Sequence, residues 1–188
     1  MKKVAILFVV LLTSSFLFAQ KTYVPDDKFE QALIDLGYDT TLDDSVLTAN
    51  ISGVTVLDVS RKSISDLTGI EAFTSLIDLS CAVNQLTSLD VSNNTALEVL
   101  NLDDNQLTSL DVSKNTQLQY LYVNGNLLTS LDVSTNTALT YLYCNENQLT
   151  IHQKKLLNWK EKIGLILEFF HSHLLKGHVF FEGKLDTK

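Results

Sequence analysis

Between residues 86 and 148, the pattern of apolar and polar positions repeats with a period of 21 residues. The three copies read LTSLDVSNNTALEVLNLDDNQ, LTSLDVSKNTQLQYLYVNGNL and LTSLDVSTNTALTYLYCNENQ. A fixed short period predicts a stack of similar turns, each too small to bury its own apolar face and completed only by its neighbours. The pattern therefore predicts a solenoid.

Each copy contains the frame L-x-x-L-x-L-x-x-N-x-L, in which Val or Cys can replace the third Leu. The frame begins at positions 97, 118 and 139, and a diverged copy begins at position 76. Before these, a fifth and atypical copy begins at Val54 and has Lys62 at the asparagine position. About five turns, or rungs, are therefore expected.

Alternation inside the frame predicts a short strand whose apolar side chains point inward. Strands repeated once per turn must be parallel and joined by right-handed crossovers. At 21 residues per turn little room remains for a helix outside, so extended or 3₁₀ segments are expected on the convex side. The frame asparagines should form an inward ladder that satisfies backbone groups in the turns. These residues are Asn84, Asn105, Asn126 and Asn147.

The frame from Val54 to Leu149 resembles the leucine-rich-repeat family. The stretch VPDDKFEQALIDLGYD before it is similar to the segment that precedes the repeats in exported bacterial, internalin-like members. The resemblance implies an α/β fold, a short right-handed solenoid with a concave parallel sheet and a small helical N-terminal cap. It also implies recognition or adhesion through contacts with another protein.

Four segments are predicted along the chain. Residues 1–20 carry two lysines, an apolar run and a small residue near the end, which is typical of a secretory signal peptide. Residues 21–50 form the cap and residues 51–150 the solenoid. Residues 151–188 are either a helical C-terminal cap or a tail that does not belong to the fold.

Within the cap, Asp27 and Glu30 after Pro25 suggest a capping box that starts a helix, and Gly37 should end it. One apolar face of this helix, formed by Phe29, Leu33 and Leu36, should cover the open end of the first rung. The nearby acidic stretch lacks the calcium-loop pattern and is interpreted as a solvated turn.

The formal net charge of −8 makes nucleic acid a poor ligand, because phosphate contacts require a basic surface. The only two cysteines, Cys81 and Cys144, occupy the same inward position three rungs apart. Rungs at strand spacing place their Cα atoms ~14 Å apart, well beyond the ~4.4–6.8 Å that a disulfide spans. Both are therefore expected to be buried free thiols.

The strand positions between the inward residues should point out from the concave face. There, four tyrosines form a two-by-two block on neighbouring rungs, and tyrosine is favoured at recognition surfaces. Aromatic stacking that merely shields the sheet is the alternative interpretation. The predicted ligand-contacting residues are Tyr120, Tyr122, Tyr141 and Tyr143, edged by Asp103, Asp104, Asn124, Asn145 and Glu146.

A second column, Asp90, Asp111 and Asp132, stacks like charges at rung spacing. Such a column requires local hydrogen bonds or a bound cation, and the neighbouring Ser and Thr residues favour local bonding. His171 and His173 would chelate a metal only in a strand, so no metal site is predicted. Neither a cofactor motif nor a catalytic constellation is present.

These patterns predict an exported, non-enzymatic and monomeric recognition module, secreted or held at the bacterial surface, that binds a protein through its concave face. No membrane span is expected in the mature chain, because the apolar run of the leader is shorter than the ~20 residues a span needs. The alternatives are a carbohydrate-binding module using the tyrosines and, less favoured, a glycan hydrolase using a carboxylate pair such as Asp103 with Glu146. The sequence does not identify the ligand.

Overall fold

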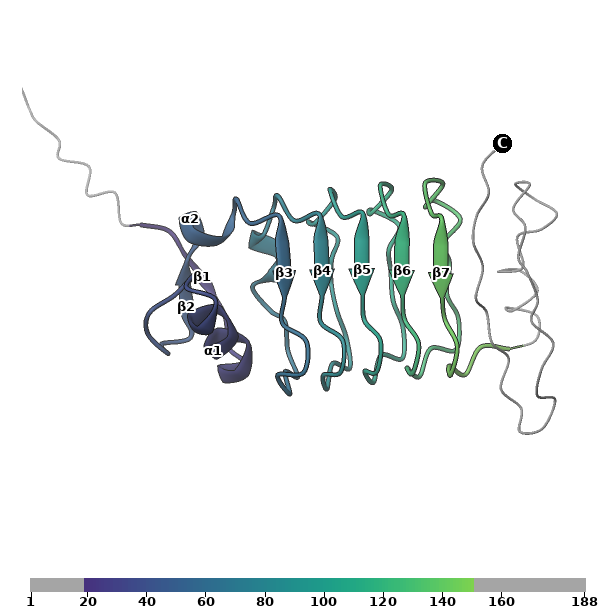
Figure 1. The fold of residues 1–188 in the computed structure, drawn as a ribbon, viewed down its shortest axis with the longest axis horizontal. Coiled ribbons are helices and arrows are strands. Elements are labelled where there is room, and N and C mark those ends of the chain that lie inside the picture. Colours follow the sequence, from purple (N-terminus) through teal and green to yellow (C-terminus); the bar gives the residue numbers. More distant parts are fainter. Residues whose placement is uncertain (1–18, 151–188) are drawn as a thin grey trace, which may run out of the picture.

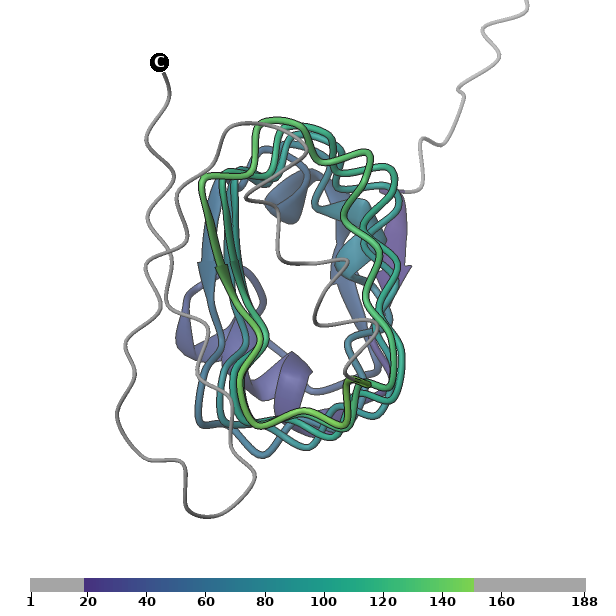
Figure 2. The same cartoon turned by 90° about the vertical axis from the view of Figure 1, so that its right-hand side faces the viewer.

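A computed structural model describes residues 19–150, which wind into an elongated coil with a small cap at its N-terminal end (Figure 1). Seen along the stack, the turns nearly superimpose, with the strands gathered on one side of each turn (Figure 2). The elements are β1 (Lys21–Tyr23), α1 (Asp27–Asp35), β2 (Ser45–Leu47), α2 (Thr48–Ile51), β3 (Val56–Asp58), the 3₁₀ helix η1 (Ile70–Ala72), β4 (Asp78–Ser80), β5 (Val99–Asn101), β6 (Tyr120–Tyr122) and β7 (Tyr141–Tyr143).

The main sheet has the order β3-β4-β5-β6-β7, and all its neighbouring strands are parallel. The central residue of each strand is a leucine that points into the coil, because successive side chains of a strand alternate between its two faces. Leu79, Leu100 and Leu121 are paired in register and fully buried. The predicted parallel leucine-rich-repeat solenoid is thus confirmed.

The return path of each turn closes the core from the opposite side. Val91, Val112 and Val133 lie there at equivalent positions and are buried. The path makes tight turns rather than α-helices: the backbone N–H of Asn115 donates to the carbonyl of Val112, three residues earlier. With η1 in the first return path, this confirms the expected extended and 3₁₀ structure on this side.

The asparagine ladder of the frame is present as predicted. The side chain of Asn126 is buried; its Oδ1 accepts a hydrogen bond from the backbone N–H of Leu107 at 3.0 Å, and its Nδ2 donates to the carbonyls of Leu102 at 2.9 Å and Val123 at 3.3 Å. One amide therefore joins two rungs by satisfying backbone groups that the short strands leave unpaired. Asn84, Asn105 and Asn147 make equivalent bonds.

A second asparagine ladder, which the leucine frame does not predict, lies on the return path. Asn94, Asn115 and Asn136 are fully buried. The Nδ2 of Asn115 donates to the carbonyls of Val91 and Asn94 in the preceding turn, both at 2.9 Å. The Oδ1 atoms of Asn94, Asn115 and Asn136 accept no hydrogen bond from residues 19–150. Each rung therefore uses one asparagine on either side of the core to join it to the rung before.

In each turn, the third residue after the strand has a left-handed backbone conformation. Arg61, Val83, Asp104, Gly125 and Glu146 all have positive φ, between 53° and 61°. Four different side-chain types and a glycine adopt this conformation, although it is strained for a β-branched residue such as Val83. The repeated turn, rather than the residue at that position, dictates the local backbone.

The cap helix α1 begins one residue earlier than predicted. Its N-cap is Asp26, whose Oδ1 accepts hydrogen bonds from the backbone N–H groups of Lys28 at 2.8 Å and Phe29 at 3.1 Å. The predicted capping box of Asp27 with Glu30 is therefore wrong, because the carboxylate of Glu30 turns towards a different segment. Gly37, with φ of 80°, follows the C-cap of the helix as expected.

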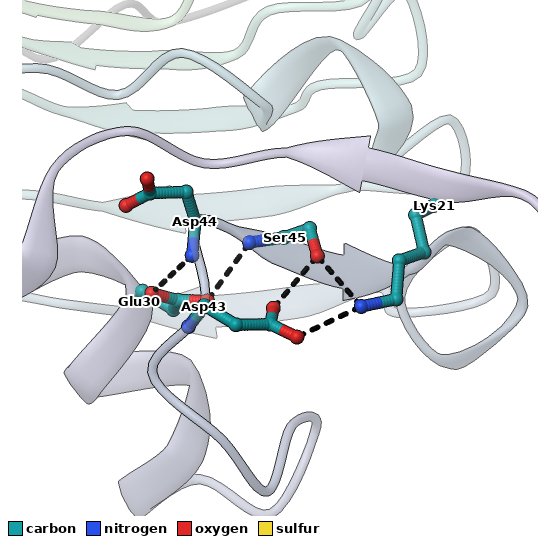
Figure 3. Close-up of polar contacts among 5 residues, drawn as sticks. All are labelled: Lys21, Glu30, Asp43, Asp44 and Ser45. Carbon is teal, nitrogen blue, oxygen red and sulfur yellow. Dashed lines mark hydrogen bonds and ion pairs between the residues drawn. The ribbon is translucent and has the colours of Figure 1, made fainter.

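The Glu30 side chain is fully buried and organises the loop that leads to β2. Its carboxylate accepts backbone hydrogen bonds from Asp43 at 3.0 Å, Asp44 at 3.1 Å and Ser45 at 2.9 Å (Figure 3). Lys21 on β1 forms an ion pair with Asp43 at 2.9 Å. The acidic stretch expected to be a solvated turn therefore surrounds the buried, negatively charged carboxylate of Glu30. The backbone N–H groups of the stretch stabilise this carboxylate.

The apolar face of α1 packs on the end of the coil. The rings of Phe29 and Phe73 lie 6.4 Å apart between centroids, and Leu33 is fully buried. Leu36, which was assigned to the same face, is 46% exposed, because the helix gives way to the C-cap at this residue. Two of the three predicted lid residues therefore cover the first rung.

Both cysteines are buried and neither is in a disulfide, as the spacing of the rungs predicts. No helix among residues 19–150 is long and apolar enough to cross a bilayer. The leader, except its last two residues, and the whole of residues 151–188, including His171 and His173, lie outside the described residues.

Candidate functional site

The outward residues of β3 to β7 form one continuous surface, here called the sheet face. Strand pairing places Val99 beside Tyr120 and Asn101 beside Tyr122, and then Tyr120 beside Tyr141 and Tyr122 beside Tyr143. The four tyrosines on β6 and β7 are called the aromatic block. The structure thus brings together the four residues that the repeat predicts on neighbouring rungs.

The rings of the aromatic block stack in two parallel pairs. Tyr120 and Tyr141 have centroids 4.9 Å apart and planes inclined by 9°. For Tyr122 and Tyr143 the values are 5.0 Å and 6°. The separation of the ring centroids matches the ~4.7–4.9 Å between neighbouring strands, so the two rings of each pair are stacked along the axis of the coil. Each ring covers one face of its partner, and the block is a ridge of half-buried rings.

The other half of the sheet face is lower and more acidic. Its outward residues are Val56, Asp58, Asp78, Ser80, Val99 and Asn101. All of these side chains are smaller than tyrosine, so the surface steps up from β5 to β6. The outward positions of β3 to β7 carry no lysine or arginine.

Asp78 lies in this lower half without a compensating cation. Burial raises its pKa, and the nearby negative charge of Asp58 raises it further. The ion pairs of the described residues place Lys21 on Asp43 and Lys62 on Asp35, both away from the sheet face. Asp78 was not among the predicted contact residues, although its place in the outward column could have identified it.

Asp103, Asn124 and Asn145 form a hydrogen-bonded row beside the ends of β5 to β7. The carboxylate of Asp103 accepts the backbone N–H of Asn124 at 2.6 Å, and Oδ1 of Asn124 accepts the backbone N–H of Asn145 at 2.8 Å. Burial raises the pKa of Asp103 despite the bond from Asn124. These side chains edge the aromatic block as predicted, and they also join successive rungs.

Asp104 and Glu146 occupy the left-handed turn position, one residue beyond that row, and both are exposed. Gly125 lies between them, and a Cβ there would be 2.5 Å from Oδ1 of Asp104. These carboxylates therefore form the rim of the sheet face rather than its centre.

Burial raises the phenol pKa of Tyr122, and the neighbouring Tyr120 and Asp103 add to the shift. A protonated phenol hydroxyl can donate a hydrogen bond to a ligand.

The column of Asp90, Asp111 and Asp132 lies on another side of the coil. In each, Oδ1 accepts the backbone N–H of the serine two residues later, at 2.8–2.9 Å. These bonds lower the pKa of all three carboxyls. The expected local bonding is confirmed.

A shallow hollow beside Asp111 and Asp132 is lined also by Ser109, Leu110, Ser113, Ser130 and Thr135. Among residues 19–150, no three metal-ligating side chains converge.

Parallel strands once per turn, an inward asparagine at each turn and extended return paths define the class: the protein is a leucine-rich-repeat solenoid. No protein-family model matches the chain. Internalin J of Listeria monocytogenes is 42% identical over 73 residues, which are 39% of this chain and 8% of that protein. The solved functional domain of InlJ from Listeria monocytogenes, which includes a cysteine ladder, is 41% identical with a TM-score of 0.64, and the match covers 70% of this chain and 30% of that one.

The solved internalin InlF from Listeria monocytogenes shares the fold, with 23% identity and a TM-score of 0.54 over 68% of this chain and 45% of that one. Within its class, the chain resembles the internalins, a likeness that rests on InlJ. It spans less than half the length of the relatives it matches.

Proposed function

We propose that the chain is a non-enzymatic recognition module that binds a protein partner through the sheet face. The similarity to internalins supports a role in interaction or adhesion. The aromatic block is the observation that carries the proposal. Four half-buried tyrosines on the last two strands of an open sheet provide rigid contact area with polar tips, which is typical of protein-binding hot spots.

The stacking of the rings favours a protein over a carbohydrate ligand. A sugar ring binds an aromatic side chain by lying on its face, but in each pair one face of each ring is covered by the other ring. The ring edges, the hydroxyls and the one uncovered face of each ring remain for contact with a ligand, and together they suit the mixed apolar and polar surface of a protein. Carbohydrate binding remains the second candidate because the rim supplies the acids and amides that bind sugar hydroxyls.

The hydrolase alternative is disfavoured by the position of its carboxylates. Asp103 and Glu146 belong to turns two rungs apart, which is ~10 Å at the strand spacing. Asp103 is partly committed to the backbone of Asn124, and Glu146 is exposed on the rim. A pair on an open surface lacks the enclosure that tunes catalytic acids.

The same proposal places the module outside the cytoplasm, secreted or at the cell surface, as a monomer exported through the signal peptide at residues 1–20. A sheet face about five strands wide is roughly 24 Å long at the strand spacing, which suits one modest interface. Mass spectrometry of the protein from its source should find a mature N-terminus near residue 21.

The test is a pull-down from the native surroundings with three forms of the protein side by side. Tyr122→Ala/Tyr143→Ala removes one stacked pair, and loss of these tyrosines should weaken capture of the partner at least about tenfold. Tyr23→Ala is the matched control, because Tyr23 is 62% exposed on the cap, away from the sheet face. Circular dichroism melting verifies that all three are folded.

Equal capture by the double variant and the wild type would contradict the proposal. A glycan array probed with the same proteins separates the two candidates. Binding to a defined glycan that is lost in the double variant, without any captured protein, would support the carbohydrate alternative instead.

A further inference from the structure

We propose that the partner segment that binds the sheet face is basic, with an arginine or lysine that lies at the step between β5 and β6. This inference rests on the proposed function and specifies the chemistry of the partner. It follows from the division of the sheet face into an acidic lower half and the aromatic block.

The lower half has uncompensated negative charge. Asp58 and Asp78 point outward from the neighbouring strands β3 and β4, close enough for Asp58 to repel the charge on Asp78. Asp78 is partly buried and has no hydrogen-bond donor or cation among the contacts of the described residues. A cation from a partner would relieve both the repulsion and the desolvation, which makes the surface complementary to a basic segment.

The step supplies the second contact. Tyr120 and Tyr122 each present one face to the stacked ring on β7, and their other faces look towards β5. The residues beside them there, Val99 and Asn101, carry no ring and are shorter. A long basic side chain in this corner would place its stem on Val99 and its charge near a tyrosine face, where a cation–π contact forms.

The rim extends the same complementarity. Asp103 lies beside the step, and its pKa is raised by burial, as is that of Asp78. Asp78 and Asp103 therefore border the corner on two sides. Arg61, the cation closest in sequence to the strands of the lower half, belongs to the exposed turn after β3. A neutral or acidic segment would leave these carboxylates desolvated and unpaired, at a cost to binding.

The test measures binding of fluorescent 12-residue peptides in which every second residue is Arg, Lys, Gln or Glu on a serine background. The variant Asp58→Asn/Asp78→Asn removes two charges from the lower half. The matched control, Asp27→Asn/Asp132→Asn, removes two charges from the cap helix and from the far side of the coil. Each pair includes one aspartate, Asp58 or Asp132, whose Oδ1 accepts a local backbone N–H that asparagine can still accept.

The wild type should bind the Arg and Lys peptides and not the Gln and Glu peptides. Each exposed charge pair contributes up to about fivefold in affinity, so Asp58→Asn/Asp78→Asn should bind the Arg peptide about ten- to twentyfold more weakly. The control should stay within about twofold. Tyr120→Leu should weaken binding about threefold, because it keeps apolar area but removes the ring.

The inference is overturned if no basic peptide binds, if the Gln peptide binds equally well, or if the two double variants behave alike. The proposed function fails separately. A native partner that is lost by Tyr122→Ala/Tyr143→Ala but retained by Asp58→Asn/Asp78→Asn would uphold protein recognition and reject the basic segment.

Discussion

At the residue scale, the fold depends on asparagine more than the leucine frame suggests. A short amide is the side chain that can accept one backbone N–H and donate to two carbonyls from the same buried position. Asn126 does this on the strand side, and Asn115 donates to two carbonyls on the return path. Leucine or aspartate at either position would leave buried carbonyl groups unpaired.

Asn126→Leu should therefore lower the free energy of unfolding by about 1–3 kcal/mol, because it orphans the backbone groups of Leu107 and Leu102. Urea unfolding followed by circular dichroism measures the loss. The control is Asn93→Leu, the same substitution at an exposed position one residue before the second ladder. Equal stability of Asn126→Leu and wild type would show that the strand-side ladder contributes nothing.

At the scale of the element, one carboxylate adds hydrogen bonds to the apolar packing that attaches the cap helix to the coil. Asp26 caps α1 with Oδ1, while its Oδ2 accepts the backbone N–H and the hydroxyl of Ser65, both at 2.8 Å, and the backbone N–H of Asp66 at 3.0 Å. Burial alone would raise the pKa of Asp26, but these hydrogen bonds outweigh it and hold the pKa below the ordinary value of 3.8. The ionised side chain thus joins α1 to the first turn.

Asp26→Asn should destabilise the protein at pH 7 by about 1–3 kcal/mol, because the amide still caps the helix but its nitrogen cannot accept bonds from Ser65 and Asp66. Since the folded pKa is depressed, the wild-type advantage is fully present above pH 3.8 and is lost as the pH falls through the folded pKa. Urea unfolding from pH 7 to pH 2.5 measures this difference. A constant difference over the whole range would contradict the role of the ionised carboxylate.

The elements also show what could be predicted from the sequence. The strands, their register and the direction of the frame residues follow from the period. In a stack of equal turns, each repeat position lies beside the equivalent position of the next turn and points the same way. The start of α1 does not follow from the sequence, because Asp26 and Asp27 are both good N-caps and tertiary contacts with Ser65 decide between them. The use of Glu30 could not be predicted either, because its partners lie in a loop 13 to 15 residues away.

At the scale of the whole molecule, the position of the candidate site follows from the same periodicity. Counting outward positions along the repeat is enough to place Tyr120, Tyr122, Tyr141 and Tyr143 on neighbouring strands. The sequence does not show that the rings stack in pairs or that Asp78 lies uncompensated on β4, two strands from the first ring. Those features depend on side-chain rotamers and on burial, which the period does not determine.

The described residues 19–150 offer one open surface, the sheet face, and the candidate reactive groups outside it are buried or hydrogen-bonded to their own turns. Burial raises the pKa of the Cys81 thiol far above its usual range, so this cysteine is inert. The carboxylates Asp90, Asp111 and Asp132 are engaged by their own turns. The proposed recognition through the sheet face therefore rests on the aromatic block.

Hydroxyl-radical footprinting of the tyrosines, with and without the captured partner, tests this claim most directly. The partner should protect Tyr120, Tyr122, Tyr141 and Tyr143 from oxidation and leave Tyr23 on the cap unchanged. Unchanged oxidation of the four tyrosines in the complex, or protection of Tyr23 alone, would contradict it.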